Sequence, residues 1–370
     1  MVGPRIINQT DTGGLNGASP LDRLPRRCRT RARADRSRGA RTTEPTRAGA
    51  QPATLRAMTT TTTMTGRPLK VGIQLPEVER EVRWPELLDM TRAIEDLGFD
   101  SVWVGEHLLY RWEDRPSRGP WEAWTLLAGI AASTSRIELG PLVSCTNFHN
   151  PALLAKQAAT VDELSGGRLV LGLGAGWNKA EFRAFGFAQD HLVSRFEEAF
   201  TIIRTLLREG AIDFDGRWYQ VRDCELLPRG PRPAGPPLMI GSKGPLMLRA
   251  TMAHADSWNA WYNDTGNRPE GVAAVRAVVD DACREVGRDP AEVERTVAVL
   301  VRLPGGAGRL QGNAEGARIL PVGGEPAEIA ETLRAFAREG IGHVQLVLDP
   351  ITLDSIRNLA PMLAELDRGS

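Results

Sequence analysis

The chain of 370 residues has few cysteines and no long hydrophobic run, and each absence excludes a class of protein. Charged side chains interrupt most stretches of ten residues, so no segment approaches the roughly 18–20 apolar residues of a membrane-spanning helix. The first residues contain no continuous apolar segment, and we therefore expect no secretory signal peptide. The four cysteines form no C-x-x-C pair, which argues against a disulfide framework or a thiolate zinc site and favours a reducing cytoplasm.

Net charge is also absent, because two segments of opposite charge cancel. Residues 1–57 contain twelve arginines, no lysine and four acidic residues, a net charge of +8. The remaining 313 residues carry 34 bases and 42 acids, a net charge of −8. We therefore predict a basic extension over residues 1–66 and an acidic domain over residues 67–370. An acidic domain is not expected to bind a polyanion such as nucleic acid.

The basic extension is rich in Arg, Thr, Pro and Gly and poor in large apolar side chains. Such a segment cannot bury enough surface to offset its ordering entropy, so we expect it to be disordered. An arm that binds nucleic acid is the alternative, which the lack of interleaved aromatic residues disfavours. A further alternative is that translation starts at Met58 or Met64, because the fold begins abruptly at Leu69.

From Leu69 onward, apolar strand patterns alternate with amphipathic helix patterns. The predicted strands cover residues 71–76, 101–107, 136–145, 168–176, 237–242, 256–261, 295–303 and 343–348. The predicted helices cover residues 85–97, 121–134, 151–164, 193–209, 245–254, 270–286, 326–339 and 352–366. A hairpin is expected around Asp215-Gly216.

Strict alternation of strand and helix implies a parallel sheet, and eight units in about 300 residues predict an α/β fold of the (β/α)8 TIM-barrel type. An open doubly wound sheet is the alternative. The glycine cluster 172–177 argues against it, because this cluster follows the fourth strand and has Trp177 where G-x-G-x-x-G requires its third glycine.

The carboxyl ends of barrel strands usually carry the functional residues. The second strand ends in Glu106-His107, where a histidine could transfer a proton near neutral pH; a purely structural histidine fits equally well. The fourth strand is followed by Trp177 and Asn178, of which the first could stack on a flat ligand and the second could also be a helix cap. The glycines in front of them, Gly174 and Gly176, would let the backbone approach such a ligand.

The fifth strand ends in Gly241, Ser242 and Lys243, just before Pro245 opens a predicted helix. Free N–H groups, a hydroxyl and a cation at a helix start favour a phosphate site over a plain turn. The strand ends together predict an aromatic cofactor pocket with a phosphate anchor, and no metal site is expected. They contain no H-x-H motif, no Schiff-base lysine and no G-x-S-x-G elbow.

Several strings carry a resemblance to a known family. They are LGFDSVWVGEH (97–107), TSRIELG (134–140), NPALLAKQAATVDELSGGRLVLGLGAGWNKAEF (150–182) and GHVQLVLDP (342–350). The chain resembles the bacterial luciferase-like superfamily, most closely its coenzyme F420-dependent branch. The resemblance covers roughly residues 69–366 and implies a TIM barrel that binds a flavin or F420 at the carboxyl ends of its strands.

The resemblance also implies roles for individual residues. Glu106 and His107 match an acidic residue and a catalytic histidine that faces the ring, and Leu142-Val143 matches a non-prolyl cis peptide that bulges against the ring. Cys145 and Thr146 match positions at the ring edge. Gly241 and Ser242 match the phosphate-binding turn. Trp177 stands where some sugar-phosphate dehydrogenases of the family have a catalytic glutamate, which argues against sugar-phosphate oxidation.

We therefore predict a cytoplasmic oxidoreductase that transfers hydride between F420 and a small organic substrate, with His107 supplying or accepting a proton. An FMN-dependent monooxygenase, which receives reduced flavin from a separate reductase, is the alternative. A non-catalytic flavin or deazaflavin carrier is a third hypothesis. Residues 108–120 and 304–322 are expected to form the substrate walls, and a homodimer is expected from the family precedent.

Overall fold

A computed structural model describes residues 66–113, 115–308 and 319–368. The chain divides into two units, Met1–Thr61 and Thr62–Ser370, and all described residues belong to the second. The predicted disorder of residues 1–66 falls almost wholly outside the described residues and stays a prediction. No helix in the described ranges is long and apolar enough to cross a membrane.

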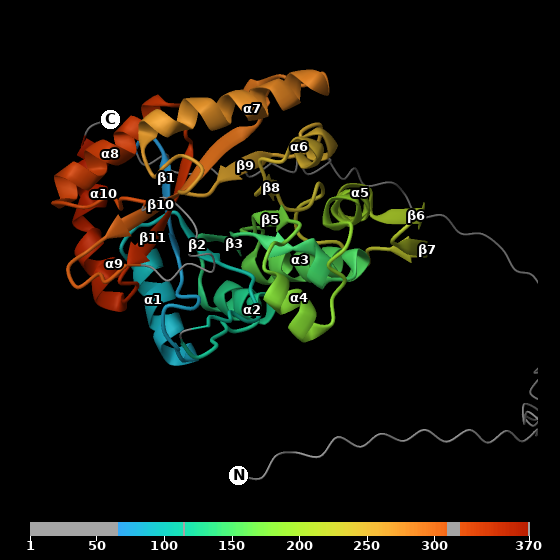
Figure 1. Ribbon diagram of the computed structural model, residues 1–370, viewed down its shortest axis with the longest axis horizontal. Helices are drawn as coiled ribbons and strands as arrows, with labels where there is room; N and C mark the ends of the chain where they lie inside the picture. Colours follow the sequence, from blue (N-terminus) through green and yellow to red (C-terminus); the bar gives the residue numbers. More distant parts are fainter. Residues whose placement is uncertain (1–65, 114, 309–318, 369–370) are drawn as a thin grey trace, which may run out of the picture. The chain divides into compact units, whose positions relative to one another are not determined.

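A nearly closed barrel of parallel strands forms the described unit, with helices around its outside (Figure 1). The strands run in the order β3-β2-β1-β11-β10-β9-β8-β5-β4. They are β1 Lys70–Gln74, β2 Ser101–Val104, β3 Glu138–Pro141, β4 Ser144–Cys145, β5 Leu171–Gly174, β8 Leu238–Ile240, β9 Ser257–Ala260, β10 Glu294–Arg302 and β11 His343–Asp349. The predicted TIM-barrel fold is confirmed.

The predicted strand 136–145 is interrupted, and this is why the sheet order names nine strands while the barrel has eight positions. β3 pairs with β2, whereas β4 pairs with β5, and a non-prolyl cis peptide bond joins Leu142 to Val143 between them. The barrel closes where Leu139 bridges to Leu169 and the N–H of Val170 donates to the carbonyl of Leu139 at 2.9 Å.

The helices follow the strands in the predicted order. They are α1 Trp84–Asp96, α2 Ala123–Ser133, α3 Pro151–Ser165, α4 Lys179–Phe185, α5 Leu192–Glu209, α6 Pro245–Thr251, α7 Val272–Glu285, α8 Pro326–Arg338, α9 Leu353–Leu359 and α10 Pro361–Arg368. The predicted helix 352–366 is two helices, since Pro361 has no N–H to continue the first. The short helix α4 was not predicted.

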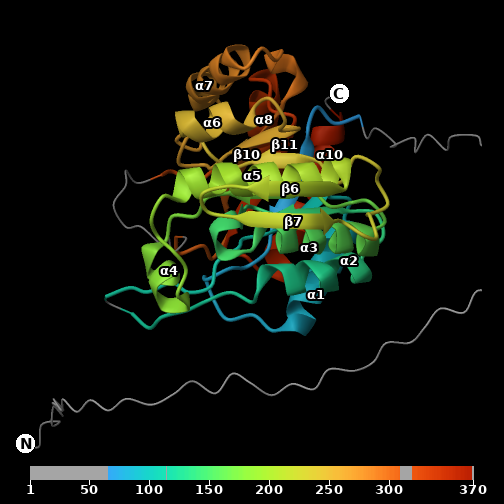
Figure 2. The ribbon, with the colours of Figure 1, turned by 90° about the vertical axis from the view of Figure 1, so that its right-hand side faces the viewer.

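Apolar side chains fill both faces of the strands, as expected for a parallel sheet covered by helices. Val71, Ile73 and Leu346 belong to the large cluster that includes the helices, whereas Trp103, Leu142 and Met239 form a smaller cluster of their own. The predicted hairpin is confirmed: β6 (Ala211–Asp215) and β7 (Gln220–Glu225) pair antiparallel, outside the barrel and beside α5 (Figure 2).

Candidate active site

His107 follows β2 at the carboxyl end of the barrel and lies between two carboxylates. Its Nδ1 donates to Oε1 of Glu181 at 2.7 Å, and its Nε2 lies 3.6 Å from Oε1 of Glu77. The imidazole is 18% exposed, the side chain of Glu181 is fully buried and that of Glu77 is 6% exposed. Burial disfavours the imidazolium, but Glu77, Glu181 and Glu106 outweigh it and raise the pKa of His107.

Glu181 also ties the loop after β2 to α4. Its Oε2 accepts from the backbone N–H of Leu108 at 3.0 Å, and its Oε1 accepts from the side chain of Asn178. The amide of Asn178 in addition donates to the carbonyl of Leu109 at 3.1 Å. These bonds hold the carboxylate of Glu181 in place, and the carboxylate in turn fixes the orientation of the His107 ring. Because Glu181 binds Nδ1, Nε2 is the ring nitrogen that can exchange a proton.

Sequence reasoning missed both carboxylate partners of His107. Glu181 lies one helical turn after Asn178, whose side chain caps α4 by accepting from the N–H of Ala180 at 3.2 Å. The capping alternative for Asn178 is thus confirmed, and the Asn-x-x-Glu spacing was the available signal for Glu181. Glu77 follows Pro76 in the loop just after β1, and nothing in that loop sequence marks it as a partner of His107.

Glu106 binds the next barrel strand rather than the ring of His107. Its Oε2 accepts from the Ser144 hydroxyl at 2.8 Å and from the Cys145 N–H at 2.6 Å, and its Oε1 lies 2.9 Å from Nε2 of His149. Although burial disfavours the charged form of His149, Glu106 raises its pKa. These bonds shape the turn after the cis peptide, so Glu106 acts on His107 through its charge.

The expected cis peptide at Leu142-Val143 is present. The half-buried Val143 packs against Gly172, Gly174 and Gly241, where an added Cβ would approach its methyl groups to 3.0, 2.8 and 2.9 Å. Val143 thus leaves no room for a side chain at Gly174 or Gly241, whereas at Gly172 the carbonyl of Pro141, at 2.2 Å, is the nearest obstruction. The apolar surface of Val143 at the strand ends fits one face of a planar ring.

The side chains of Cys145 and Thr146 are buried behind this turn. The Thr146 hydroxyl donates to the carbonyl of Gly174 at 3.3 Å, and a Cβ on Gly176 would lie 2.4 Å from the sulfur of Cys145. Burial and the nearby carboxylates raise the pKa of the Cys145 thiol. Contacts of these two residues with a ring edge stay predictions, and they would involve the backbone.

The aromatic rings of Trp177 and Tyr110 lie beside the imidazole of His107. The ring of Trp177, which is 47% exposed, lies edge-on 5.5 Å from the imidazole. Tyr110 lies 4.7 Å from the imidazole and is stacked on Trp112 at 5.9 Å. Trp177 is thereby brought next to His107, and its exposed face is available to a ligand.

The predicted phosphate turn lies directly before α6. Lys243 forms an ion pair with Asp264, and the Ser242 hydroxyl accepts from the N–H of Gly244 at 3.2 Å. The carbonyl of Ser242 accepts from the indole of Trp258 at 2.6 Å. A phosphate at this turn would compete with Asp264 for the ammonium group of Lys243.

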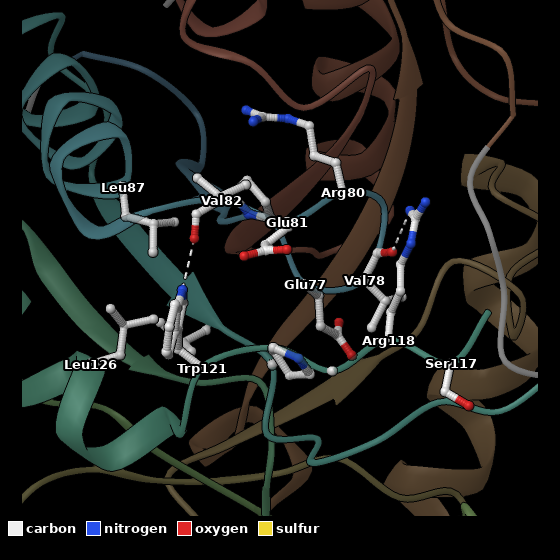
Figure 3. Close-up of a pocket in the computed structure, with 15 residues that line it drawn as sticks. Glu77, Val78, Arg80, Glu81, Val82, Leu87, Ser117, Arg118, Trp121 and Leu126 are labelled. Atoms are coloured by element: carbon white, nitrogen blue, oxygen red, sulfur yellow. Dashed lines mark hydrogen bonds between the residues drawn. The ribbon is translucent and has the colours of Figure 1, made fainter.

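A pocket of about 350 Å³ lies beside this site, between the loops that follow β1 and β2 (Figure 3). Its wall is half polar and half apolar, and Glu77 lies between Trp121 and Leu126 on one side and Arg118 and Ser117 on the other. Residues 117–120 of the predicted substrate loop contribute to it. Part of the other predicted wall, residues 309–318, lies outside the described residues.

Comparison with known proteins points to one family. The family model described as luciferase-like monooxygenase matches residues 44–303. The chain is 34% identical over 181 residues to 5,10-methylenetetrahydromethanopterin reductase of Archaeoglobus fulgidus, covering 49% of each chain. It is 31% identical over 186 residues to the F420-dependent glucose-6-phosphate dehydrogenase of Amycolatopsis mediterranei, covering 49% of this chain and 54% of that one.

The chain is about as similar to a monooxygenase as it is to these two F420- and methanopterin-related enzymes. The chain is 31% identical over 173 residues to pyrimidine monooxygenase RutA of Klebsiella pneumoniae, covering 45% of this chain and 47% of that one. The chain thus matches about half the length of these curated relatives.

Solved structures agree on the fold. An F420-dependent secondary alcohol dehydrogenase in complex with an F420-acetone adduct matches with a TM-score of 0.69 at 18% identity, covering 80% of this chain and 99% of that one. The oxygenating constituent of 3,6-diketocamphane monooxygenase from Pseudomonas putida, in complex with FMN, matches with a TM-score of 0.61 at 16% identity, covering 81% and 96%. Together with the family model, which spans well over half of the sequence, these findings establish that the chain belongs to the luciferase-like monooxygenase family.

Proposed function

We propose that this protein is an oxidoreductase that transfers a hydride between coenzyme F420 and a small organic substrate. The observation that carries the proposal is the geometry of His107, which is held through Nδ1 by Glu181 at the carboxyl end of the barrel. Its raised pKa favours the imidazolium, because the attraction of Glu77, Glu181 and Glu106 outweighs the effect of burial. A hydride acceptor such as a carbonyl group needs one proton in addition to the hydride, and an imidazolium supplies it.

The residues at the strand ends fit a planar cofactor. Val143 would support one face of the ring, Trp177 has an exposed aromatic face beside His107, and the turn Gly241 to Lys243 would hold a phosphate. When bound, F420 would supply or accept the hydride at its deazaflavin ring. The protein orients the substrate toward the ring, excludes water and delivers the proton from Nε2 of His107.

The charge of His107 favours one direction of reaction. The imidazolium can donate a proton but cannot accept one, so the site is better prepared to reduce a carbonyl or imine than to oxidise an alcohol. Glu77, Glu106 and Glu181 sustain this charge. Oxidation would require His107 to be neutral first, and it should therefore become faster as the pH rises.

An FMN-dependent monooxygenase is the second candidate, because the similarity to pyrimidine monooxygenase RutA is close to that of the F420-dependent relatives. It would receive reduced flavin from a separate reductase. Either enzyme could act as a homodimer in the cytoplasm, which stays a proposal, as does a carrier that binds the cofactor without catalysis.

Titration of the purified protein with F420 and with FMN decides between the cofactors. Binding is measured from the change in cofactor fluorescence, with riboflavin as a phosphate-free control. We expect F420 to bind at least tenfold more tightly than FMN, a difference of about 1.4 kcal/mol. Tight FMN binding without F420 binding would overturn the proposal, and F420 binding without turnover of any small ketone or imine would favour the carrier.

A further inference from the structure

The aromatic rings of Tyr110 and Trp177 lie 4.7 and 5.5 Å from the imidazole of His107, and they leave little of it exposed. These rings therefore limit direct contact of His107 with solvent in the ligand-free protein, and a bound cofactor and substrate would cover what remains. After each proton transfer, His107 must nevertheless exchange a proton with solvent before the next cycle. The exchange therefore needs a route that does not pass through the cofactor site.

Glu77 lies on the side of His107 opposite to Glu181. Its Oε1 is 3.6 Å from Nε2 of the imidazole and accepts from the Tyr110 hydroxyl at 2.6 Å. Its Oε2 accepts from the side-chain amide of Gln74 at 3.1 Å. These bonds hold the carboxylate near the one imidazole nitrogen that Glu181 leaves available. A small rotation, or one bridging water, would complete a hydrogen bond over that distance.

The same carboxylate forms part of the wall of the 350 Å³ pocket between the loops after β1 and β2. A pocket of this size holds several water molecules. Its described lining includes Leu87 of α1, Leu126 of α2, and Val104 and Gly105 at the end of β2, but none of the predicted cofactor residues. In Figure 3, the carboxylate of Glu77 is directed into the region between Val78, Arg118 and the loop that carries Trp121.

We propose that Glu77 is a proton relay that connects His107 to solvent through this pocket. A solvent acid gives a proton to Glu77, and the protonated carboxyl group passes it from Oε1 to Nε2 of a neutral His107. The carboxylate is then restored and His107 is an imidazolium again, so no other group changes its charge. Release of a proton follows the same path in reverse. The proposal depends on the proposed function only for its use in turnover.

The ligand-free protein allows a direct test, because an imidazolium quenches the fluorescence of a nearby indole. Trp177 therefore reports the protonation of His107 in a stopped-flow pH jump. The Trp177→Phe variant isolates its signal from that of other pairs, such as His191 and Trp218 at 4.8 Å. The pair of Trp103 and His343 does not interfere, since burial lowers the pKa of His343 to about 3.

The groups that face His107 are Glu77, Glu106, Tyr110 and Glu181, so removing one charge also shifts its pKa. Each variant is therefore jumped to a pH equally far below its own His107 pKa. We expect Glu77→Gln to slow protonation by about tenfold or more. The matched control is Glu81→Gln, which removes another carboxylate from the lining of the same pocket. The side chain of Glu81 is 72% exposed and is paired with Arg83. This control variant should leave the rate unchanged.

Two further variants guard against a merely structural effect. Acetate should restore the rate in Glu77→Ala, because a small carboxylic acid can replace the missing relay. Leu126→Trp keeps Glu77 but fills the pocket from α2, and it should slow protonation as well. An unchanged rate in either Glu77→Gln or Leu126→Trp, each with normal thermal unfolding, would overturn the proposal. Because no cofactor or substrate is present, its failure is distinct from a failure of the proposed function.

Discussion

The carboxylate of Glu181 lies 2.7 Å from Nδ1 of His107, and it joins two parts of the chain that are 74 residues apart. Its side chain is completely buried, so the bond is shielded from solvent and salt. A carboxylate at Nδ1 fixes the tautomer and the orientation of the ring, which directs Nε2 toward its reaction partner. The pair is the central feature of the candidate site, and it can be tested from both sides.

Replacement of His107 by glutamine should lower the rate of carbonyl reduction by about 10²-fold or more, because the site loses its general acid. The affinity for F420 should change little. Steady-state rates with reduced F420 and small ketones, together with cofactor titration, measure the two effects. His254→Gln is a suitable control, since His254 is exposed on the surface. Equal rates in the two variants would reduce His107 to a structural residue.

Replacement of Glu181 by glutamine should change the pH dependence of stability. In the wild-type protein the folded-state pKa of His107 is raised above about 6.5. The resulting stabilisation is fully present below that pH and is lost as the pH rises through the raised pKa. Loss of the charged hydrogen bond should cost roughly 1.5–3 kcal/mol at the acidic end and less at the alkaline end.

Urea unfolding at a series of pH values from mildly acidic to alkaline measures this effect. Glu163→Gln, at an exposed position on α3, is the control for the loss of one carboxylate. A slope of unfolding free energy against pH in Glu181→Gln that equals the wild-type slope would contradict the coupling.

The barrel was predictable because its strands are short apolar runs and its longer helices have a clear apolar face. Leu192–Glu209 shows this face over 18 residues, whereas α4 has seven residues, which is too short for helical periodicity to stand out. The C-terminal helix was predicted as one because its apolar spacing continues across Pro361, where the helix nevertheless ends.

The candidate site was predictable where it depends on strand ends and not where it depends on contacts between loops. His107 and the cis bond before Val143 follow directly from position and resemblance. Glu77 and Glu181 reach His107 only through the folded arrangement of the loop after β1 and of α4. A buried charge on a seven-residue helix has no sequence signal beyond its spacing from the capping Asn178.

Replacement of Gly174 by alanine tests the support of Val143. The added Cβ would lie 2.8 Å from a methyl group of Val143, so one of them must move. Overpacking of this kind costs about 1–3 kcal/mol, and the shifted side chain should also weaken cofactor binding. Thermal unfolding and F420 titration measure the two effects. The double variant Val143→Ala/Gly174→Ala should recover most of both, because the side chains are in contact and their effects couple. A double variant as unstable as the single one would show that the glycine is needed for another reason.

Replacement of Lys243 by alanine tests the predicted phosphate turn. Its ammonium group is largely exposed and is paired with Asp264, so a phosphate would gain only modestly from it. A loss of ~1 kcal/mol, or about fivefold in F420 affinity, is the upper range for an exposed charge pair. Arg249→Ala, which removes an exposed cation from α6, the helix that follows the turn, should leave the affinity unchanged. Asp264→Asn should maintain or increase it, since the lysine is then released for the phosphate. A deazaflavin without a phosphate should bind all four proteins equally, and a Lys243 effect on that ligand would place the lysine at the ring instead.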